Sequence, residues 1–251
     1  MSRHLQQITS TKTNRIGHSG LNRNRNRKGR RLRAGRSHRL EALEQRLVFS
    51  ALPVIAHELG QNVAFSSADR WELSGPNGRH TEIEHVDAME LAEGSIGITF
   101  TAEDIDGRQA LISKDARGYA DGGHLTALFS GDYVEVRMQS VDRSVWVRSD
   151  RGSVVPGQTY QMLITFGDSG LKLYLDGQLV DAELEFTQGL EDNHENIAVG
   201  ANIWARSDRN PQWVDNHFQG QLSDFVIYKR ALTRSEVALI TNTEPAEPQP
   251  T

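Results

Sequence analysis

Short runs of alternating apolar and polar residues fill the chain from residue 94 onward, and they limit the folds open to it. A period of two places successive side chains on opposite faces of a strand, so each run can bury one face. The runs lie at residues 96–100, 109–113, 124–129, 133–139, 145–149, 160–166 and 171–175. Their spacing suits hairpins, and the pattern predicts an all-β fold, a two-sheet antiparallel sandwich.

Turn and cap residues support this prediction. Asp176-Gly177 lies between two apolar runs, and both residues tolerate the positive φ of a type I′ hairpin turn. Two further strands are expected at residues 196–200 and 217–228. Thr233 and Glu236 have the spacing of a capping box, which predicts a short C-terminal helix.

The charge is divided unevenly along the chain. Residues 1–39 hold 12 of the 28 Lys and Arg and no acidic residue, whereas all 33 Asp and Glu follow them. This basic tail has too few apolar side chains to offset the entropy of ordering, so we expect disorder. We predict an amphipathic segment and linker at 40–58, the globular domain at 59–241 and a disordered Pro/Glu tail at 242–251.

The composition excludes several classes of site. The chain has no Cys, which rules out a disulfide scaffold, a thiolate metal centre and a thiol nucleophile. Its apolar runs fall short of the roughly 18 residues that cross a bilayer as a helix, so no transmembrane span is expected. The histidines show no His-x-x-x-His spacing, so the sequence predicts no zinc site.

The order of the strings LKLYLDG, IAVG and FQGQLSDFVIYKRAL, followed by the capped helix, resembles the laminin-G-like, or concanavalin A-like lectin/glucanase, jelly-roll family. The resemblance spans roughly residues 94–240. It implies two packed antiparallel sheets of six or seven strands each. It assigns no activity, because this fold hosts binding modules, hydrolases and lyases.

The segment LEALEQRLVFSA, residues 40–51, resembles the LEPR-type motif of exported bacterial proteins. Its matching positions are Leu43, Glu44, Arg46, Leu47, Val48, Ser50 and Ala51, whereas Gln45 departs from the pattern. The resemblance implies export to the extracellular space or cell surface; the alternative is an ordinary helix before the domain. Nucleic-acid binding by the basic tail is disfavoured, because it lacks interleaved aromatic residues and an acidic domain follows it.

Carboxylate spacing argues against an enzyme. A retaining glycosidase needs two carboxyl groups about 5–5.5 Å apart, and the family's glucanase branch carries them as Glu-x-Asp-x-x-Glu. The nearest strings, at 82–84, 103–106 and 183–185, lack this three-carboxylate spacing. We expect a non-catalytic module, with a glycan-active hydrolase or lyase of the same fold as the alternative.

Calcium is the cation that suits this composition, because oxygen-rich turns supply its hard ligands. Asp115 and Asp121 bracket one loop, and Asp224 lies on the long final strand. Related jelly rolls often carry a calcium ion, so these three are the candidate metal ligands. Equally, Asp115 and Asp121 could serve as Asx-turn residues that bond their own backbone.

The long loop at residues 202–218 is the candidate ligand site. Sugar rings stack on indoles, while sugar hydroxyls bond to Asp, Asn and Arg side chains. The candidate binding residues are Trp204, Arg206, Asp208, Asn210 and Trp213. Alternatively, one or both tryptophans anchor the loop to the sheet edge. The sequence thus favours a carbohydrate- or glycoconjugate-binding module, with a structural or protein-adhesion domain, contacting a surface protein, as a further alternative.

Overall fold

The computed structural model describes residues 61–73, 79–115, 122–206 and 209–241. The predicted basic tail, the export segment and the Pro/Glu tail lie outside these ranges, as do Asp121 and Asp208. Among the described residues, no helix is long and apolar enough to cross a membrane.

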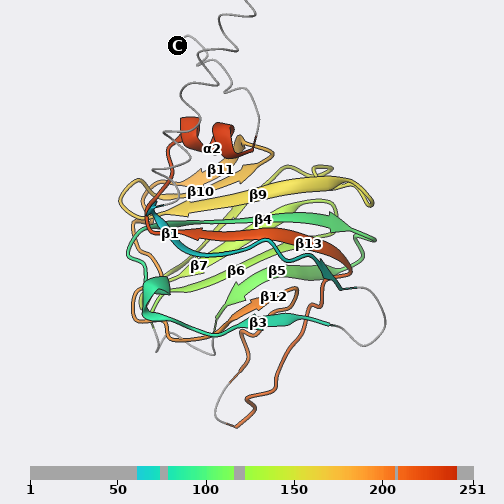
Figure 1. The fold of residues 1–251 in the computed structure, drawn as a ribbon, viewed down its shortest axis with the longest axis horizontal. Coiled ribbons are helices and arrows are strands. Elements are labelled where there is room, and N and C mark those ends of the chain that lie inside the picture. Colours follow the sequence, from blue (N-terminus) through green and yellow to red (C-terminus); the bar gives the residue numbers. More distant parts are fainter. Residues whose placement is uncertain (1–60, 74–78, 116–121, 207–208, 242–251) are drawn as a thin grey trace, which may run out of the picture. The chain divides into compact units, whose positions relative to one another are not determined.

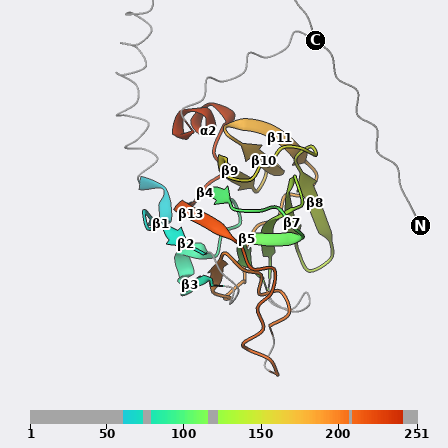
Figure 2. The same ribbon diagram turned by 90° about the vertical axis from the view of Figure 1, so that its right-hand side faces the viewer.

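Two antiparallel sheets form the two layers of a sandwich (Figures 1 and 2), which confirms the predicted fold class. The seven-stranded sheet has the order β1-β13-β4-β9-β10-β11, with β2 also paired to β13. Its strands are β1 Val63–Ser67, β2 Trp71–Glu72, β4 Gly94–Ala102, β9 Thr159–Phe166, β10 Leu171–Leu175, β11 Gln178–Glu183 and β13 Gly220–Tyr228.

The six-stranded sheet has the order β3-β12-β5-β6-β7-β8. Its strands are β3 Thr81–Ile83, β5 Arg108–Lys114, β6 His124–Ser130, β7 Val134–Gln139, β8 Ser144–Arg148 and β12 Ile197–Val199. A 3-10 helix, η1 Asp87–Met89, follows β3, and the C-terminal helix α2 spans Arg234–Ile240. The two sheets have seven and six strands, as the family resemblance implied.

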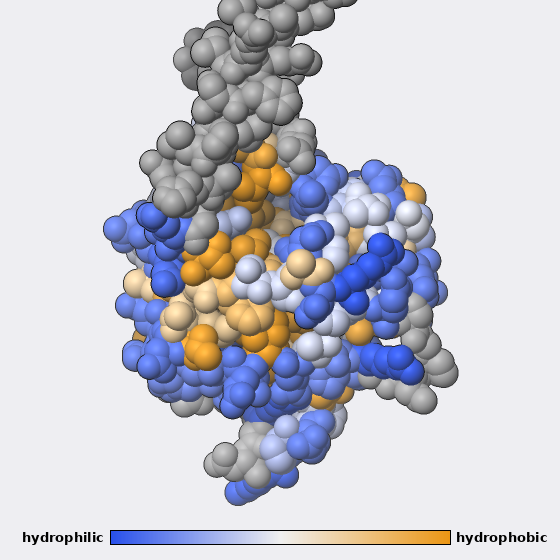
Figure 3. Space-filling view, viewed as in Figure 1, coloured by the Kyte–Doolittle hydropathy of each residue, from blue (hydrophilic) through white to orange (hydrophobic). Residues whose placement is uncertain are grey.

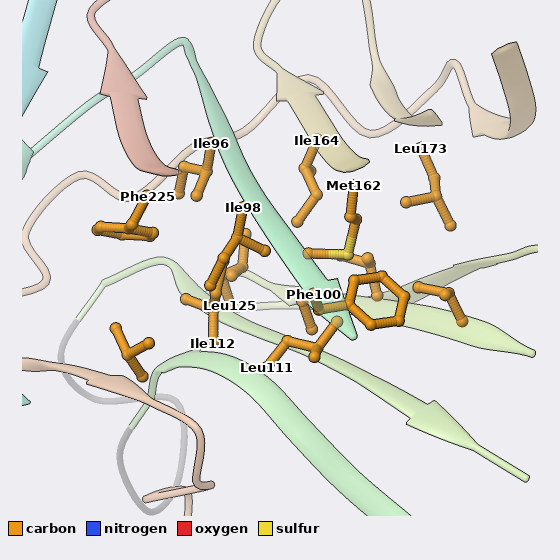
Figure 4. Packing of buried hydrophobic residues seen from close by; sticks show 14 of the residues in the cluster. Ile96, Ile98, Phe100, Leu111, Ile112, Leu125, Met162, Ile164, Leu173 and Phe225 are labelled. Carbon is orange, nitrogen blue, oxygen red and sulfur yellow. The ribbon is translucent and has the colours of Figure 1, made fainter. Parts of the chain in front are cut away.

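The main core lies between the sheets, because alternate residues of each strand point inward. On β4 these are Ile96, Ile98 and Phe100, each at most 2% exposed. Figure 4 shows them meeting side chains of the opposite sheet, among them Leu111 and Leu125. The alternation seen in the sequence therefore separates this core from the two outer faces of the sandwich.

The predicted turn and cap are both present. Asp176 and Gly177 have φ values of 48° and 75°, as a type I′ turn between β10 and β11 requires. Thr233 and Glu236 form the reciprocal capping box of α2. Buried Val237 packs α2 against Leu163 and Tyr228 in a second, smaller apolar cluster.

Candidate functional site

A groove of about 360 Å³ lies over the six-stranded sheet. Strands β5 to β8 contribute Arg108, Thr126, Leu128, Arg137 and Trp146 to its lining. The loop between β12 and β13 contributes Asn202, Trp204, Asp215 and Asn216, and Asp115 lies just after β5. The groove therefore combines the outer face of the sheet with one long loop.

Strand alternation explains which side chains reach the groove. Along β7, Val134, Val136 and Met138 belong to the core, so Glu135 and Arg137 point to the opposite face. The same alternation on β6 and β8 turns Thr126, Leu128 and Trp146 outward.

Asp115 is the buried anchor beneath the groove. Its side chain is 0% exposed, and its Oδ2 atom lies 2.5 Å from Arg137 Nη2. Thr126 Oγ1 donates to the same oxygen at 2.7 Å, and Oδ1 lies 2.9 Å from His124 Nδ1. Because Asp115 is fully buried, the group that faces the groove is the guanidinium of Arg137, whose side chain is 21% exposed.

Glu135 forms a second covered carboxylate next to Trp146. It accepts from Arg108 Nη2 at 2.7 Å and from Arg148 Nε at 3.1 Å, while its own side chain is only 5% exposed. Both guanidinium groups also pack on the indole of Trp146, at 5.9 and 5.2 Å from the ring centroid. Trp146 is 37% exposed. Two cations thus hold the indole in place at one wall of the groove.

The described part of the β12–β13 loop, residues 200–206 and 209–219, forms the other wall and projects away from the sandwich in Figures 1 and 2. Its stem is closed by two backbone hydrogen bonds between Asn202 and Asp215, of 2.9 and 3.0 Å. Asp215 Oδ2 accepts from the indole nitrogens of Trp204, at 3.1 Å, and Trp213, at 3.4 Å. One carboxylate therefore orients both tryptophans, each more than 40% exposed.

Arg206 fastens this loop to the sheet. Its guanidinium makes a bidentate ion pair with Glu82 on β3, with distances of 2.6 and 3.0 Å, and Nε donates to the Trp213 carbonyl. The bond from Arg206 lowers the pKa of Glu82 from 4.5 to about 2. Arg206, predicted to contact a ligand, is thus engaged within the protein.

Glu82→Gln is expected to lower the free energy of unfolding by about 1–2 kcal/mol at neutral pH, after allowing for solvent screening. Because the folded-state pKa of Glu82 lies below the unfolded one, its contribution is complete above pH 4.5 and lost as the pH falls toward about 2. Urea unfolding of both proteins at several pH values measures this difference. The exposed Glu185→Gln is the control, and a difference independent of pH would contradict the prediction.

The predicted binding residues occupy different places. Trp204 lines the groove, whereas Trp213 lies beside it on the same loop and outside the groove lining. Asn210 is exposed farther along the loop. Sequence reasoning missed Arg137 and Trp146, although both take outward positions on the predicted strands 133–139 and 145–149. It also missed Arg108, which lies just before the predicted strand 109–113.

The described candidate calcium ligands do not come together. Asp115 follows β5 of the six-stranded sheet and is paired with Arg137, whereas Asp224 lies on β13 of the other sheet. Asp224 is exposed, has a φ of 53° and stands where the pairing of β13 with β4 shifts register. Calcium binding stays a prediction. Among the described residues, the group that converges as possible metal ligands is His85, Glu90 and His194.

A second hollow, of about 320 Å³, lies on the outer face of the seven-stranded sheet. Its lining is largely apolar and includes Leu163, Val226 and Ile240, with Asp224 at its border. Figure 3 shows apolar side chains gathered on this face, where β1, β4 and β13 lie in Figure 1. Its lining holds one charged side chain, Asp224, whereas the lining of the groove over the six-stranded sheet holds two arginines and two aspartates. The groove is therefore the better candidate for a polar ligand.

Comparison with known proteins settles the family. A family model described as the concanavalin A-like lectin/glucanases superfamily matches residues 65–238. The chain belongs to this superfamily. This membership confirms the resemblance that the strand order and the capped helix indicated in the sequence. No match was found among curated proteins.

Solved structures share the superfamily fold. The CBM40 of the Ruminococcus gnavus IT-sialidase, bound to alpha2,3 sialyllactose, matches with a TM-score of 0.58 at 14% identity, covering 71% of this chain and 99% of that one. The leech intramolecular trans-sialidase matches with a TM-score of 0.58 at 12% identity, over 72% of this chain and 28% of its own. The K499G mutant of NanB sialidase from Streptococcus pneumoniae matches with a TM-score of 0.58 at 13% identity, covering 70% of this chain and 28% of its own.

Proposed function

We propose that this superfamily member is a non-catalytic module that binds a carbohydrate, or the glycan of a glycoconjugate, in the groove over the six-stranded sheet. The observation that carries the proposal is the pair of partly exposed indoles, Trp146 and Trp204, in one groove with fixed polar side chains. Indoles can stack on the apolar faces of sugar rings, and the polar groups can bond to hydroxyls.

We further propose that the bound sugar carries a carboxylate. The groove side of the sheet presents Arg108 and Arg137, whose side chains are 48% and 21% exposed, over Glu135 and Asp115, which are 5% and 0% exposed. Guanidinium groups bind carboxylates through charge-assisted, often bidentate hydrogen bonds. The Ruminococcus gnavus module of the same fold is bound to sialyllactose, which supports this choice of probe.

The carboxylates around the groove favour binding over hydrolysis. Asp115 and Glu135 accept bonds from arginines, and Asp215 accepts from two indoles. A glycosidase needs one carboxylic acid that donates a proton and a second carboxylate that attacks or activates water. These three acids are instead used to position Arg137, Trp146 and Trp204.

The test is calorimetric titration of the full chain with sialyllactose and, in parallel, with lactose, which lacks the carboxylate. We expect sialyllactose to bind and lactose to bind at least tenfold more weakly. Trp146→Ala and Trp204→Ala should each weaken sialyllactose binding by about tenfold or more, since aromatic anchors dominate such sites. Arg151→Ala is the control, because Arg151 is 81% exposed and packs on Tyr133 outside this groove.

Each other result is informative. Equal binding of lactose and sialyllactose would contradict the acidic-sugar proposal and leave a neutral glycan. Loss of binding in Trp213→Ala but not in Trp146→Ala would move the site to the projecting loop. Conversion of the glycan during titration would show an enzyme. If a glycan array gives no signal, the carbohydrate proposal fails and the protein-adhesion alternative replaces it.

Export to the cell surface is a further proposal, supported by the resemblance of residues 40–51 to the LEPR-type motif. It agrees with a glycan-binding role, because glycans with terminal acidic sugars are displayed outside cells. Calcium as a cofactor is a further proposal, made from the sequence. Because Asp115 and Asp224 belong to different sheets, one ion would bind either at Asp115 with Asp121 or at Asp224.

A further inference from the structure

Three potential metal ligands converge at one end of the six-stranded sheet. His85 follows β3, Glu90 follows η1, and His194 lies in the loop before β12. One ligand atom of each lies within 4.8 Å of the others. Glu90 Oε1 is 3.5 Å from His85 Nε2 and 3.3 Å from His194 Nδ1.

These distances fit metal coordination better than hydrogen bonding. Nitrogen and oxygen atoms in a good hydrogen bond lie about 2.7–3.2 Å apart. Ligand atoms around a tetrahedral zinc ion, with bonds of about 2.1 Å, are separated by roughly 3.4 Å. Both measured distances lie close to this tetrahedral edge.

His85 supplies an independent observation. Its side chain is only 13% exposed, and its Nε2 atom is buried and has no hydrogen-bond partner. Buried polar atoms are normally hydrogen-bonded, so an unpartnered imidazole nitrogen facing a carboxylate needs an explanation. A cation between the two groups would provide one.

We propose that His85, Glu90 and His194 bind a zinc ion, with water completing the tetrahedron. Two imidazole nitrogens with one carboxylate form a donor set that suits zinc, whereas calcium prefers six to eight oxygen ligands. His194 is 69% exposed, which leaves an entry path for the ion. The site shares no residue with the groove lining, so it is independent of the proposed glycan binding.

Lys114 positions the His85 ring and limits the affinity. Its Nζ atom lies 3.2 Å from His85 Nδ1 and donates to the Glu195 carbonyl at 2.6 Å. Zinc-bound imidazoles usually donate their second N–H to an oxygen acceptor, which raises their basicity. When Nε2 of His85 binds zinc, Nδ1 must carry the N–H, whereas the Lys114 ammonium can only donate, so two donors face each other. This opposition predicts weaker binding than in a buried structural zinc site.

Zinc binding here would tie the segment around η1 to the loop before β12. These segments are separated by about a hundred residues of sequence but meet at the ion. A ligand that binds only the folded state raises its stability according to its concentration and affinity. The proposal therefore predicts a melting temperature that rises with zinc.

The test is titration of the untagged, chelator-treated full chain with zinc chloride, followed by calorimetry and thermal unfolding. We expect one zinc ion bound by these residues and a zinc-dependent rise in melting temperature that calcium chloride does not reproduce. His194→Ala and Glu90→Gln should each weaken zinc binding at this site by about 10–100-fold or more, since each removes a ligand. Cobalt chloride adds a visible absorption band typical of tetrahedral coordination, which both variants should lose.

Asp192→Asn is the matched control. It removes one negative charge from an exposed position of the same loop, and its φ of 58° suits asparagine. It should bind zinc as the unmodified protein does. If both ligand variants also bind zinc normally, or zinc leaves the melting temperature unchanged, the proposal is wrong. The three side chains would then form only contacts between Glu90 and two histidines.

Discussion

Asp115→Ala is expected to lower the free energy of unfolding by about 3–5 kcal/mol, the cost of breaking one partner out of a buried ion pair. The carboxylate is fully buried and receives Arg137, Thr126 and His124. Its removal leaves the partly buried guanidinium of Arg137 without this counter-charge and takes away the acceptor of the buried Thr126 hydroxyl. Urea unfolding measured by circular dichroism provides the value.

Two further variants make the result specific. Asp150→Ala, at an exposed position, should change the free energy of unfolding by less than about 0.5 kcal/mol. The double variant Asp115→Leu, Arg137→Met should recover part of the lost stability, because apolar side chains of similar size need no counter-charge. A loss below about 1 kcal/mol in Asp115→Ala would show that the buried pair contributes little.

Gly123→Ala is expected to cost more than about 3 kcal/mol, or to prevent folding, because the new methyl group has no room. A Cβ atom at Gly123 would lie 1.7 Å from the Gly189 carbonyl oxygen, which belongs to backbone and cannot rotate away. The Gly123 N–H also donates to the Glu191 carbonyl, so the two segments cannot simply separate. Soluble yield and thermal unfolding measure the effect.

The control for this prediction is Gly131→Ala. Gly131 has a φ of 66° but no atom within 4 Å of the new Cβ, so only backbone strain is added, about 1–2 kcal/mol. Comparing the two variants separates steric overlap from conformational strain. Equal losses in both would show that the loop around Gly189 yields to the methyl group.

Local patterns explain how far the fold was predictable. The alternation of apolar and polar residues along β7 depends only on the extended backbone of successive residues, so the sequence alone identifies Val134 and Val136 as core residues. Turn chemistry at Asp176-Gly177 and the capping box at Thr233 are likewise decided within a few residues. The short strands β1 to β3 were missed, because runs of two to five partly exposed residues give little periodic signal.

The site was less predictable because it depends on which strands become neighbours. The sequence indicated Trp204 through the length and composition of its loop, and the structure places that indole in the groove. Arg206 has the hydrogen-bonding side chain expected of a ligand contact, yet it pairs with Glu82, 124 residues earlier in the chain. Only the pairing of β3 with β12 brings Glu82 near this loop.

The amino-acid sequence by itself determined the all-β class, the strand pattern, the tight turn and the capped helix, because each follows from backbone geometry over a few neighbouring residues. The tertiary structure decided the groove and the convergence of His85, Glu90 and His194. Their side chains come from strands and loops far apart along the chain. Their separations are set by sheet order and register, which no local spacing of residues records.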